Sequence, residues 1–404
     1  MYPATVAVTG LGTVTGSGIG PGSLWNDVVS VRPRVRCLSF GSRNYLGVCI
    51  PDREALRHTC SDVARYDDFT WLGFLAAQEA LFDAGWDTRP SSFTRAAVII
   101  GTAFGGITTI EETYHGLFVA KRERTRPLTL PSAMSNSLAG IIATRYRMEG
   151  PNLTLSTACS SSAHAIGLGW QWISHGICDV VVAGGSDAPL VSGTYASWDA
   201  LKVLAPLCDP PDVAVKPFDQ QRRGLVLGEG ASVIVLEAGH RAKLWSRPPL
   251  AFVRGYGASA DAKHLTHPDA NGMARAMEQC LISGSCSPSE VDYIHAHGTG
   301  TLSNDMAESA AIRHVFGTPS PPVSSSKPIT GHTMGAAGSI SVAVAILSLM
   351  HQTIPATANL RHIDPQCEGV HHVTEPLKSP IRRVMVNAFG FGGNNASILI
   401  EAVS

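Results

Sequence analysis

The amino-acid sequence repeats a pattern, and this repeat constrains the fold more than any other feature. Residues 231–238 and 396–402 both begin Ala-Ser, continue through an apolar run and end Glu-Ala. Each segment lies at the end of a similar series of elements. Each series begins with an apolar strand that runs into glycines, at residues 6–12 in the first and at 252–257 in the second. Such self-similarity indicates an internal duplication, and thus two α/β halves of similar plan. The predicted halves are residues 1–245 and 246–404.

A cysteine lies where the first half turns from a strand into a helix. Residues 153–157 alternate β-branched and apolar side chains, which predicts a buried strand, and residues 163–173 predict a mostly apolar helix. Cys159 would then lie near the N-terminus of a buried helix, where the helix dipole and unpaired N–H groups favour a thiolate and bind an oxyanion. Free cysteine is also a common core residue, so this stretch alone leaves a nucleophile and a structural cysteine equally open.

Two histidines in the second half stand in comparable surroundings. His297 follows an apolar strand at residues 291–295, and His332 lies in a glycine- and alanine-rich turn before a long helix. The duplication would place Cys159 and His332 at equivalent helix N-termini, facing one another across a pseudo-two-fold axis. A single histidine is more often structural than catalytic. One thiol and two imidazoles beside small residues nevertheless indicate covalent acyl transfer, with the histidines as donors to developing negative charge.

Composition and cysteine use exclude several classes of function. A hydrophobic content of 44% with 16% charged residues is typical of a globular protein with a large core. The net charge of −1 gives no reason to expect nucleic acid or an anionic membrane as a partner. The nine cysteines are odd in number and form no CxxC pair, which favours reduced thiols over a disulfide framework or a zinc site.

Local patterns also limit the compartment and the ligands. Residues 1–8 lead directly into a strand and lack the pattern of a signal peptide, and the most apolar helix, at 338–350, is too short and too broken by serine to span a bilayer. We therefore expect a soluble cytoplasmic protein without a metal. The glycines at 10–20 do not have the G-x-G-x-x-G spacing of a dinucleotide site and are expected in tight turns.

Four segments together resemble the β-ketoacyl-ACP synthase family, nearest to the synthase I/II type and to type II polyketide ketosynthases. They are Thr157-Ala158-Cys159-Ser160-Ser161, His297-Gly298-Thr299-Gly300-Thr301, the Lys-Pro-Ile-Thr-Gly-His stretch that opens residues 327–338, and the Asn-Ala-Phe-Gly-Phe-Gly-Gly-Asn-Asn stretch at 387–395. The resemblance covers essentially the whole chain. It implies a thiolase fold, an α/β protein whose two fused halves form a duplicated five-layer αβαβα sandwich, working as a dimer.

The resemblance also implies a reaction. Cys159 would take an acyl chain, as a thioester, from the phosphopantetheine arm of an acyl carrier protein (ACP). Malonyl-ACP would lose CO2, and its enolate would attack that thioester and extend the chain by two carbons. His297 and His332 would donate from Nε2 to the enolate oxygen, while the backbone N–H groups of Cys159 and Phe391 would bind the thioester oxyanion.

Further positions receive roles from the same resemblance. Lys327 would lie behind His332 and form a charge pair with Glu308 that orders the site, unless this is a plain structural ion pair. Thr299 and Thr301 would hydrogen-bond the pantetheine amides. Phe391, between glycines, would gate the site. No metal or organic cofactor is expected, because the phosphopantetheine belongs to the carrier protein.

Two positions depart from the family pattern, and the expected partner suggests a surface. Asn394 stands where the family more usually has threonine, and Phe104 stands near the acyl pocket where a smaller or aliphatic residue is common. Phe104 would restrict the pocket to short or planar, unsaturated chains, unless it rotates aside or fills the dimer interface. Because ACP is strongly acidic, a basic rim is expected around the tunnel mouth. The candidate cations are Arg65, Arg124 and Arg126.

Other functions on the same fold are less compatible with these residues. A degradative thiolase carries a second catalytic cysteine near the C-terminus, whereas residues 387–395 contain none and Cys367 lies in an unrelated context. A chain-length-factor subunit lacks the nucleophile that Cys159 would supply. A homodimer is expected, and a heterodimer with a chain-length-factor-like subunit stays open. Fatty-acid, polyketide and polyene pathways are all compatible with the sequence.

Overall fold

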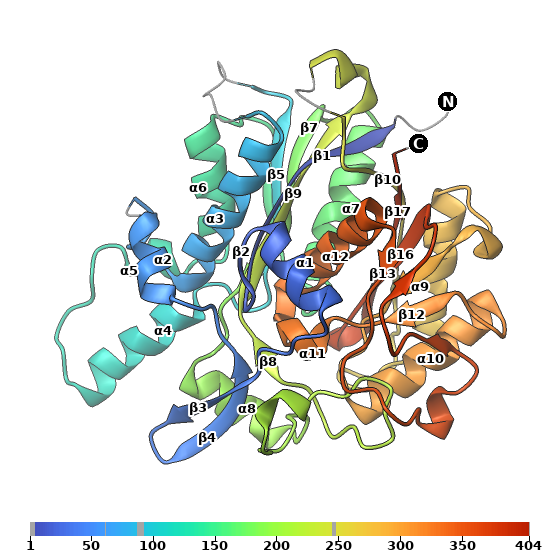
Figure 1. The fold of residues 1–404 in the computed structure, drawn as a ribbon. Helices are drawn as coiled ribbons and strands as arrows, with labels where there is room; N and C mark the ends of the chain where they lie inside the picture. Colours follow the sequence, from blue (N-terminus) through green and yellow to red (C-terminus); the bar gives the residue numbers. More distant parts are fainter. Residues whose placement is uncertain (1–4, 61, 87–92, 245–247, 404) are drawn as a thin grey trace.

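One 12-stranded sheet runs through the molecule, and its two halves are built alike (Figure 1). The computed structural model describes residues 5–60, 62–86, 93–244 and 248–403. From the centre outward, the first half contains β1 (Val6–Thr15), β9 (Gly230–Ala238), β7 (Val180–Asp187), β5 (Ala96–Gly101) and β6 (Asn152–Leu155). The second half contains β10 (Ala251–Ala260), β17 (Asn394–Glu401), β16 (Arg383–Gly390), β11 (Tyr293–His295), β12 (Pro322–Ser324) and β14 (His371–His372). These eleven strands follow one another across the sheet, and the twelfth, β2 (Gly18–Ile19), pairs only with β1.

The pairing of the strands repeats on the two sides of the centre. β1 and β10 meet antiparallel, with Val6 opposite Val253. Outward from each of them come two antiparallel pairings and then two parallel ones. The first pairing of each half even carries a register shift at the same place, after Val8 in β1 and after Val253 in β10. The predicted duplication is therefore visible in the sheet, although the predicted boundary at residues 245 and 246 lies outside the described residues.

Helices cover both faces of the sheet, and the three largest hydrophobic cores lie between helices and sheet. Two helices, α7 (Ser161–Ser174) and α12 (Ala337–His351), pack between the halves (Figure 1). The outer face of the first half is covered by α3 (Asp68–Asp83) and α6 (Ser137–Tyr146), and that of the second by α9 (Ala270–Ser283) and α10 (Leu302–Phe316). The outer helices of the first half, its part of the sheet, the inner helices, the second half's part of the sheet and its outer helices make five layers. This arrangement confirms the predicted thiolase-type sandwich.

Only some of the glycines at 10–20 form the predicted tight turns. Gly16 lies in the turn that joins β1 to β2. Gly10 lies inside β1, which continues to Thr15, and Gly257 likewise lies inside β10, which continues to Ala260. A Cβ at Gly10 would lie 2.0 Å from the Ala80 carbonyl oxygen of α3, and a Cβ at Gly257 would lie 2.1 Å from the Ala276 carbonyl oxygen of α9. In both halves, glycine therefore lets the outer helix approach the strand backbone closely.

Two other expectations are corrected by burial. The strand predicted at 153–157 is β6, which forms an edge of the sheet and leaves Leu153 41% exposed, so it is not a buried strand. The apolar segment Met334–His351 is, by length and composition, long enough to cross a membrane, contrary to the prediction. It is 89% buried inside the protein, which identifies it as a core helix.

The remaining elements connect this framework. They are the strands β2 (Gly18–Ile19), β3 (Arg36–Phe40), β4 (Arg43–Val48), β8 (Leu227–Gly228), β13 (Thr353–Ile354) and β15 (Leu377–Lys378), and the helices α1 (Pro21–Val29), α2 (Arg53–Thr59), α4 (Ile107–Tyr114), α5 (Thr129–Ala133), α8 (Ser192–Ala200) and α11 (Lys327–Thr330). Short 3-10 or π turns separate several of them, among them η1 (His115–Val119), η2 (Pro211–Val213), η3 (Gly239–Leu244), η4 (Pro288–Glu290), η5 (Met334–Ala336), η6 (Pro365–Cys367) and η7 (Phe391–Gly393).

Candidate active site

The turn that carries Cys159 is strained and firmly held. Ala158, the residue before the cysteine, has a φ of +53°, in the left-handed region that few non-glycine residues adopt. The hydroxyl of Ser161 accepts a hydrogen bond from the Thr157 N–H at 2.9 Å and donates one to the Ala158 carbonyl at 2.6 Å. These bonds place Cys159, which is buried, two residues before α7 begins.

His332 lies at the corresponding turn of the second half. It follows α11 and precedes η5 and α12, and Met334 after it also has a positive φ, of +49°. The Met334 N–H donates to Nδ1 of His332 at 3.3 Å. A nitrogen that accepts from a backbone N–H carries no proton of its own, so the proton of the neutral ring is on Nε2.

His297 lies in the loop that follows β11, and two buried charged side chains hold that loop. Glu308 of α10 accepts hydrogen bonds from the backbone N–H groups of His297 and Gly298, at 2.7 and 2.8 Å. The Lys327 ammonium donates to the His297 carbonyl oxygen, and its Nζ lies 3.4 Å from Nδ1 of the same residue. Lys327 therefore lies behind His297, not behind His332 as predicted. Its contact with Nδ1 favours the Nε2–H form of this ring too.

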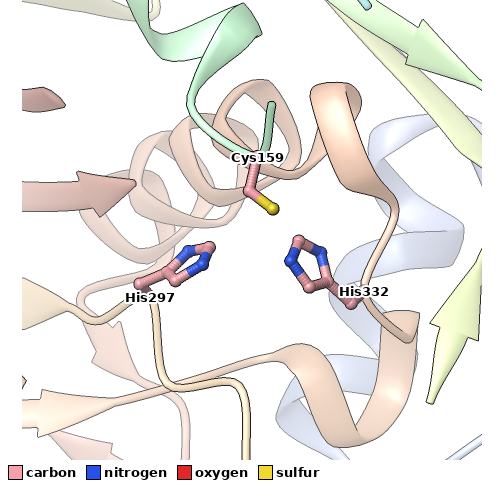
Figure 2. Close-up of side chains that lie close together, drawn as sticks. All are labelled: Cys159, His297 and His332. Atoms are coloured by element: carbon pink, nitrogen blue, oxygen red, sulfur yellow. The ribbon is translucent and has the colours of Figure 1, made fainter. Parts of the chain in front are cut away.

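The three side chains converge on one point (Figure 2). The Cys159 sulfur and one nitrogen of each imidazole all lie within 4.8 Å of one another, and the two ring centroids are 5.3 Å apart. All three residues line a cavity of about 240 Å³. By distance alone the group could hold a metal ion, but each Nδ1 is engaged and each Nε2 carries a proton. The histidines are thus arranged to donate hydrogen bonds into the cavity.

Burial controls the ionisation of these groups. It lowers the pKa of His297 and His332 well below the usual value, and the nearby Lys327 charge acts in the same direction. Both rings are therefore neutral at physiological pH. Burial also raises the pKa of the Cys159 thiol to about 11, which outweighs the opposing effects of Lys327 and of the Phe391 N–H. The predicted thiolate is therefore not the resting form, which is the thiol.

Phe391 follows β16 and lies against the cysteine turn. A Cβ on the preceding residue, Gly390, would lie 2.6 Å from the Thr157 carbonyl oxygen, so only glycine allows this approach. The Phe391 N–H interacts with the Cys159 thiol. This is the position from which a backbone donor would meet the oxyanion of a thioester formed on Cys159.

Thr299, Thr301 and Phe104 all lie near Cys159, but only the two threonines line the cavity. Thr299 and Thr301 line the cavity, and their hydroxyls are 2.8 Å apart. Phe104 lies in the hydrophobic cluster that surrounds Cys159, and its N–H donates to the Asp187 carboxylate at 3.1 Å.

None of the three cations expected at a basic rim lines the cavity. Arg65 lines a surface hollow beside Tyr66 and Phe74, and Arg124 and Arg126 line another next to α4. Cys367, the cysteine considered for a thiolase, is buried in the outer core of the second half.

Three supporting residues escaped the sequence analysis. Asp187, fully buried, accepts hydrogen bonds from Thr102, from the backbone of Ala103 and Phe104, and from Gly335 beyond His332. Asp305 accepts from the N–H groups of Thr299 and Gly300. The ring of Trp198 lines the cavity beside Cys159. The only signal for Asp187 was a carboxylate at the end of an apolar strand; the other two residues gave none.

Comparisons with known proteins agree with this geometry. The family models for the N-terminal and C-terminal domains of beta-ketoacyl synthase match residues 4–242 and 250–361. The chain is 33% identical to a 3-oxoacyl-[acyl-carrier-protein] synthase 2 of Coxiella burnetii, over 100% of both chains. The ishigamide ketosynthase/chain length factor superposes with a TM-score of 0.90 at 29% identity and 100% coverage of both chains. A type II polyketide ketosynthase solved with its acyl-carrier protein, AntDE:AntF, gives 0.91 at 28%, covering 99% of this chain and 100% of that one.

Proposed function

Because this chain belongs to the β-ketoacyl synthase family and is a ketosynthase, we propose how its own residues carry out the decarboxylative condensation of malonyl-ACP with an acyl chain on Cys159. The observation that carries the assignment of roles is the convergence of the Cys159 sulfur with two neutral imidazoles in one cavity, beside the Phe391 N–H. A thiol supplies the covalent intermediate, and the N–H donors are placed where negative charge develops.

The first half-reaction is a thioester exchange. The Cys159 sulfur forms a bond to the acyl carbon, the bond to the pantetheine sulfur breaks, and the proton lost by Cys159 leaves on the pantetheine thiol. Since thiol is exchanged for thiol, no net proton is consumed, which suits a resting Cys159 that is protonated. The transient oxyanion accepts hydrogen bonds from the N–H groups of Cys159 and Phe391.

The second half-reaction forms the carbon–carbon bond. The malonyl carboxylate leaves as CO2, and the bonding electrons pass into an enolate whose oxygen accepts from Nε2–H of His297 and His332. The enolate carbon attacks the acyl carbon, Cys159 departs as a thiolate, and it takes a proton from solvent. Neutral rings are suited to this step, since each keeps its donor without requiring a counter-charge in a buried site.

ACP is the macromolecular partner in this proposal. Exposed cations next to cavity-lining residues support a docking site: Lys202 stands between Leu201 and Val203, and Arg223 two residues before Leu225. An acidic carrier protein would be attracted to such a rim. Thr299 and Thr301 would then meet the amides of its pantetheine arm.

A dimer completes the proposal for assembly. The exposed edge strand β6 leaves a row of backbone groups open to pairing, and a second copy would cover it together with Leu153. A chain-length-factor-like subunit is the alternative partner, as in the ishigamide ketosynthase/chain length factor.

The cysteines and the pocket residues bear on the compartment and on the choice of substrate. All nine cysteines are free, which supports a reducing, cytoplasmic location. The reaction as written uses no metal or organic cofactor. Phe104, packed in the cluster around Cys159, would favour short or planar, unsaturated acyl chains, which occur in both fatty-acid and polyketide or polyene pathways.

The experiment is intact-mass analysis after incubation with acyl-ACPs of graded length and unsaturation. Wild-type protein should gain the mass of one acyl group, and Cys159→Ala should gain none. Adding malonyl-ACP should then discharge the acyl group and release CO2 and β-ketoacyl-ACP. The absence of any adduct on the wild-type protein, alone and with a candidate partner subunit, would overturn the proposal.

A further inference from the structure

The ring of Phe391 is packed against a tryptophan that the catalytic steps above do not use. Trp198, on α8, stacks on Phe391 with ring centroids 5.5 Å apart and an angle of 27° between the planes. Its side chain is 7% exposed and lies in the same hydrophobic cluster as Cys159. Both rings line the catalytic cavity, so the stack forms part of its wall.

The backbone around Phe391 is held by hydrogen bonds and includes a glycine in the left-handed region. The Gly392 N–H donates to the Leu265 carbonyl oxygen at 2.7 Å. The Asn394 side chain donates a hydrogen bond to the Phe391 carbonyl at 3.1 Å. Gly392 has a φ of +81°, a conformation that glycine adopts without strain. The ring and the N–H proposed to bind the oxyanion belong to the same residue, so a backbone motion that carries the ring away from Cys159 also moves the donor.

We propose that Trp198 is a positioning residue whose stack holds Phe391 against Cys159 and thereby sets the length of acyl chain that Cys159 accepts. The inference rests on the proposed function. A short acyl group reaches the sulfur beside the stacked rings, whereas a long one must displace the Phe391 ring and lose the aromatic contact. Such a contact contributes on the order of a two- to ten-fold factor to an equilibrium constant.

The test compares acylation of Cys159 by acetyl and octanoyl thioesters of N-acetylcysteamine, followed by intact mass. Trp198→Ala and Trp198→Leu should raise the octanoyl-to-acetyl rate ratio by about five-fold, since both lose the stack. Trp198→Phe keeps an aromatic ring and should stay close to wild type. Trp25→Ala is the matched control, because Trp25 is equally buried and stacks on His351 instead.

A second readout does not depend on acyl transfer. Alkylation of Cys159 by N-ethylmaleimide and by a bulky N-alkylmaleimide should show the same change in ratio. Unchanged ratios in Trp198→Ala and Trp198→Leu would overturn the proposal, as would equal changes in the Phe and Leu variants, which would indicate volume and not stacking. A wild type that reacts with maleimides but accepts no thioester would instead count against the proposed function, while the maleimide ratio still decides the role of Trp198.

Discussion

At the scale of single residues, position and ionisation have different origins. The motifs were sufficient to single out Cys159, His297 and His332, and the structure brings the three together. Their protonation could not be predicted from sequence, because it depends on how completely the folded chain removes water from each group. The helix N-terminus suggested a thiolate, but full burial of the sulfur dominates. Lys327 was assigned to the wrong imidazole for a similar reason, since sequence neighbours do not show which ring a long side chain reaches.

The reactivity of Cys159 should therefore depend steeply on pH. With a pKa raised to about 11, the reactive thiolate fraction grows about ten-fold per pH unit across the neutral range. We expect the rate of alkylation by iodoacetamide, measured at the Cys159 peptide, to rise with that slope from about pH 6.5 to about 8.5 without a plateau. A plateau below pH 8 would mean that the thiolate is already formed. Alkylation that persists in Cys159→Ala comes from the other cysteines and serves as the background.

The histidines should act on condensation more than on acylation. Replacing His332 by alanine removes one Nε2–H donor to the enolate, and loss of one such donor typically lowers the rate on the order of 100-fold or more. We expect CO2 release from malonyl-ACP to fall by that factor while the acyl adduct on Cys159 still forms. His351→Ala, at the C-terminal end of α12 and outside the cavity, is the control. Equal losses in both half-reactions would contradict the assigned role.

At the scale of elements, patterns of apolar residues located most strands and helices but not their surroundings. Glycine inside a strand and glycine in a turn look alike in sequence, so Gly10 was assigned to a turn, whereas it lies in a strand and allows α3 to approach closely. The edge position of β6 was missed because its apolar alternation is the same as that of a central strand. Asp187, which joins the end of β7 to the turn after His332, was missed because its four donors come from distant parts of the chain.

Asp187 should be essential to the alignment of these elements. Asn at this position keeps one acceptor oxygen but turns an NH2 group toward the N–H groups of Ala103 and Gly335, which both lose their acceptor. Each unpaired buried donor costs about 1–3 kcal/mol, so Asp187→Asn should lower the free energy of unfolding by about 2–6 kcal/mol and reduce condensation. Denaturant unfolding and the condensation rate would show this. The exposed Asp62→Asn should change neither, and equal behaviour of the two variants would refute the role.

At the scale of the whole molecule, the repeat was enough to predict two α/β halves of similar plan, and the resemblance to the β-ketoacyl-ACP synthase family implied the five-layer architecture. A duplicated α/β unit has few ways to bury two apolar faces. The surface around the cavity was not predictable in this way. Loops of both halves form its rim, and the place of a loop in the sequence does not show which hollow it lines. Arg124 and Arg126, which were expected at the rim, line another hollow.

Charge at the rim should govern the encounter with ACP. The double variant Lys202→Glu and Arg223→Glu should raise KM for acyl-ACP on the order of ten-fold, more at low salt, by removing electrostatic attraction. Acylation by a small N-acetylcysteamine thioester should be unchanged. Lys378→Glu, on β15, is the matched control. If Arg124→Glu and Arg126→Glu raise KM instead, docking uses the surface first expected from sequence.

The pseudo-two-fold relation has a mechanical consequence. Cys159 and His332 lie in the turns that precede α7 and α12. The first turns of these two helices touch where Gly338 meets Ala163: a Cβ on that glycine would lie 2.8 Å from the Ala163 Cβ. The distance between the Cys159 sulfur and the His332 imidazole therefore depends on how closely α7 and α12 pack. A single methyl group added at this crossing would act as a wedge, altering the chemistry of a site that it does not touch.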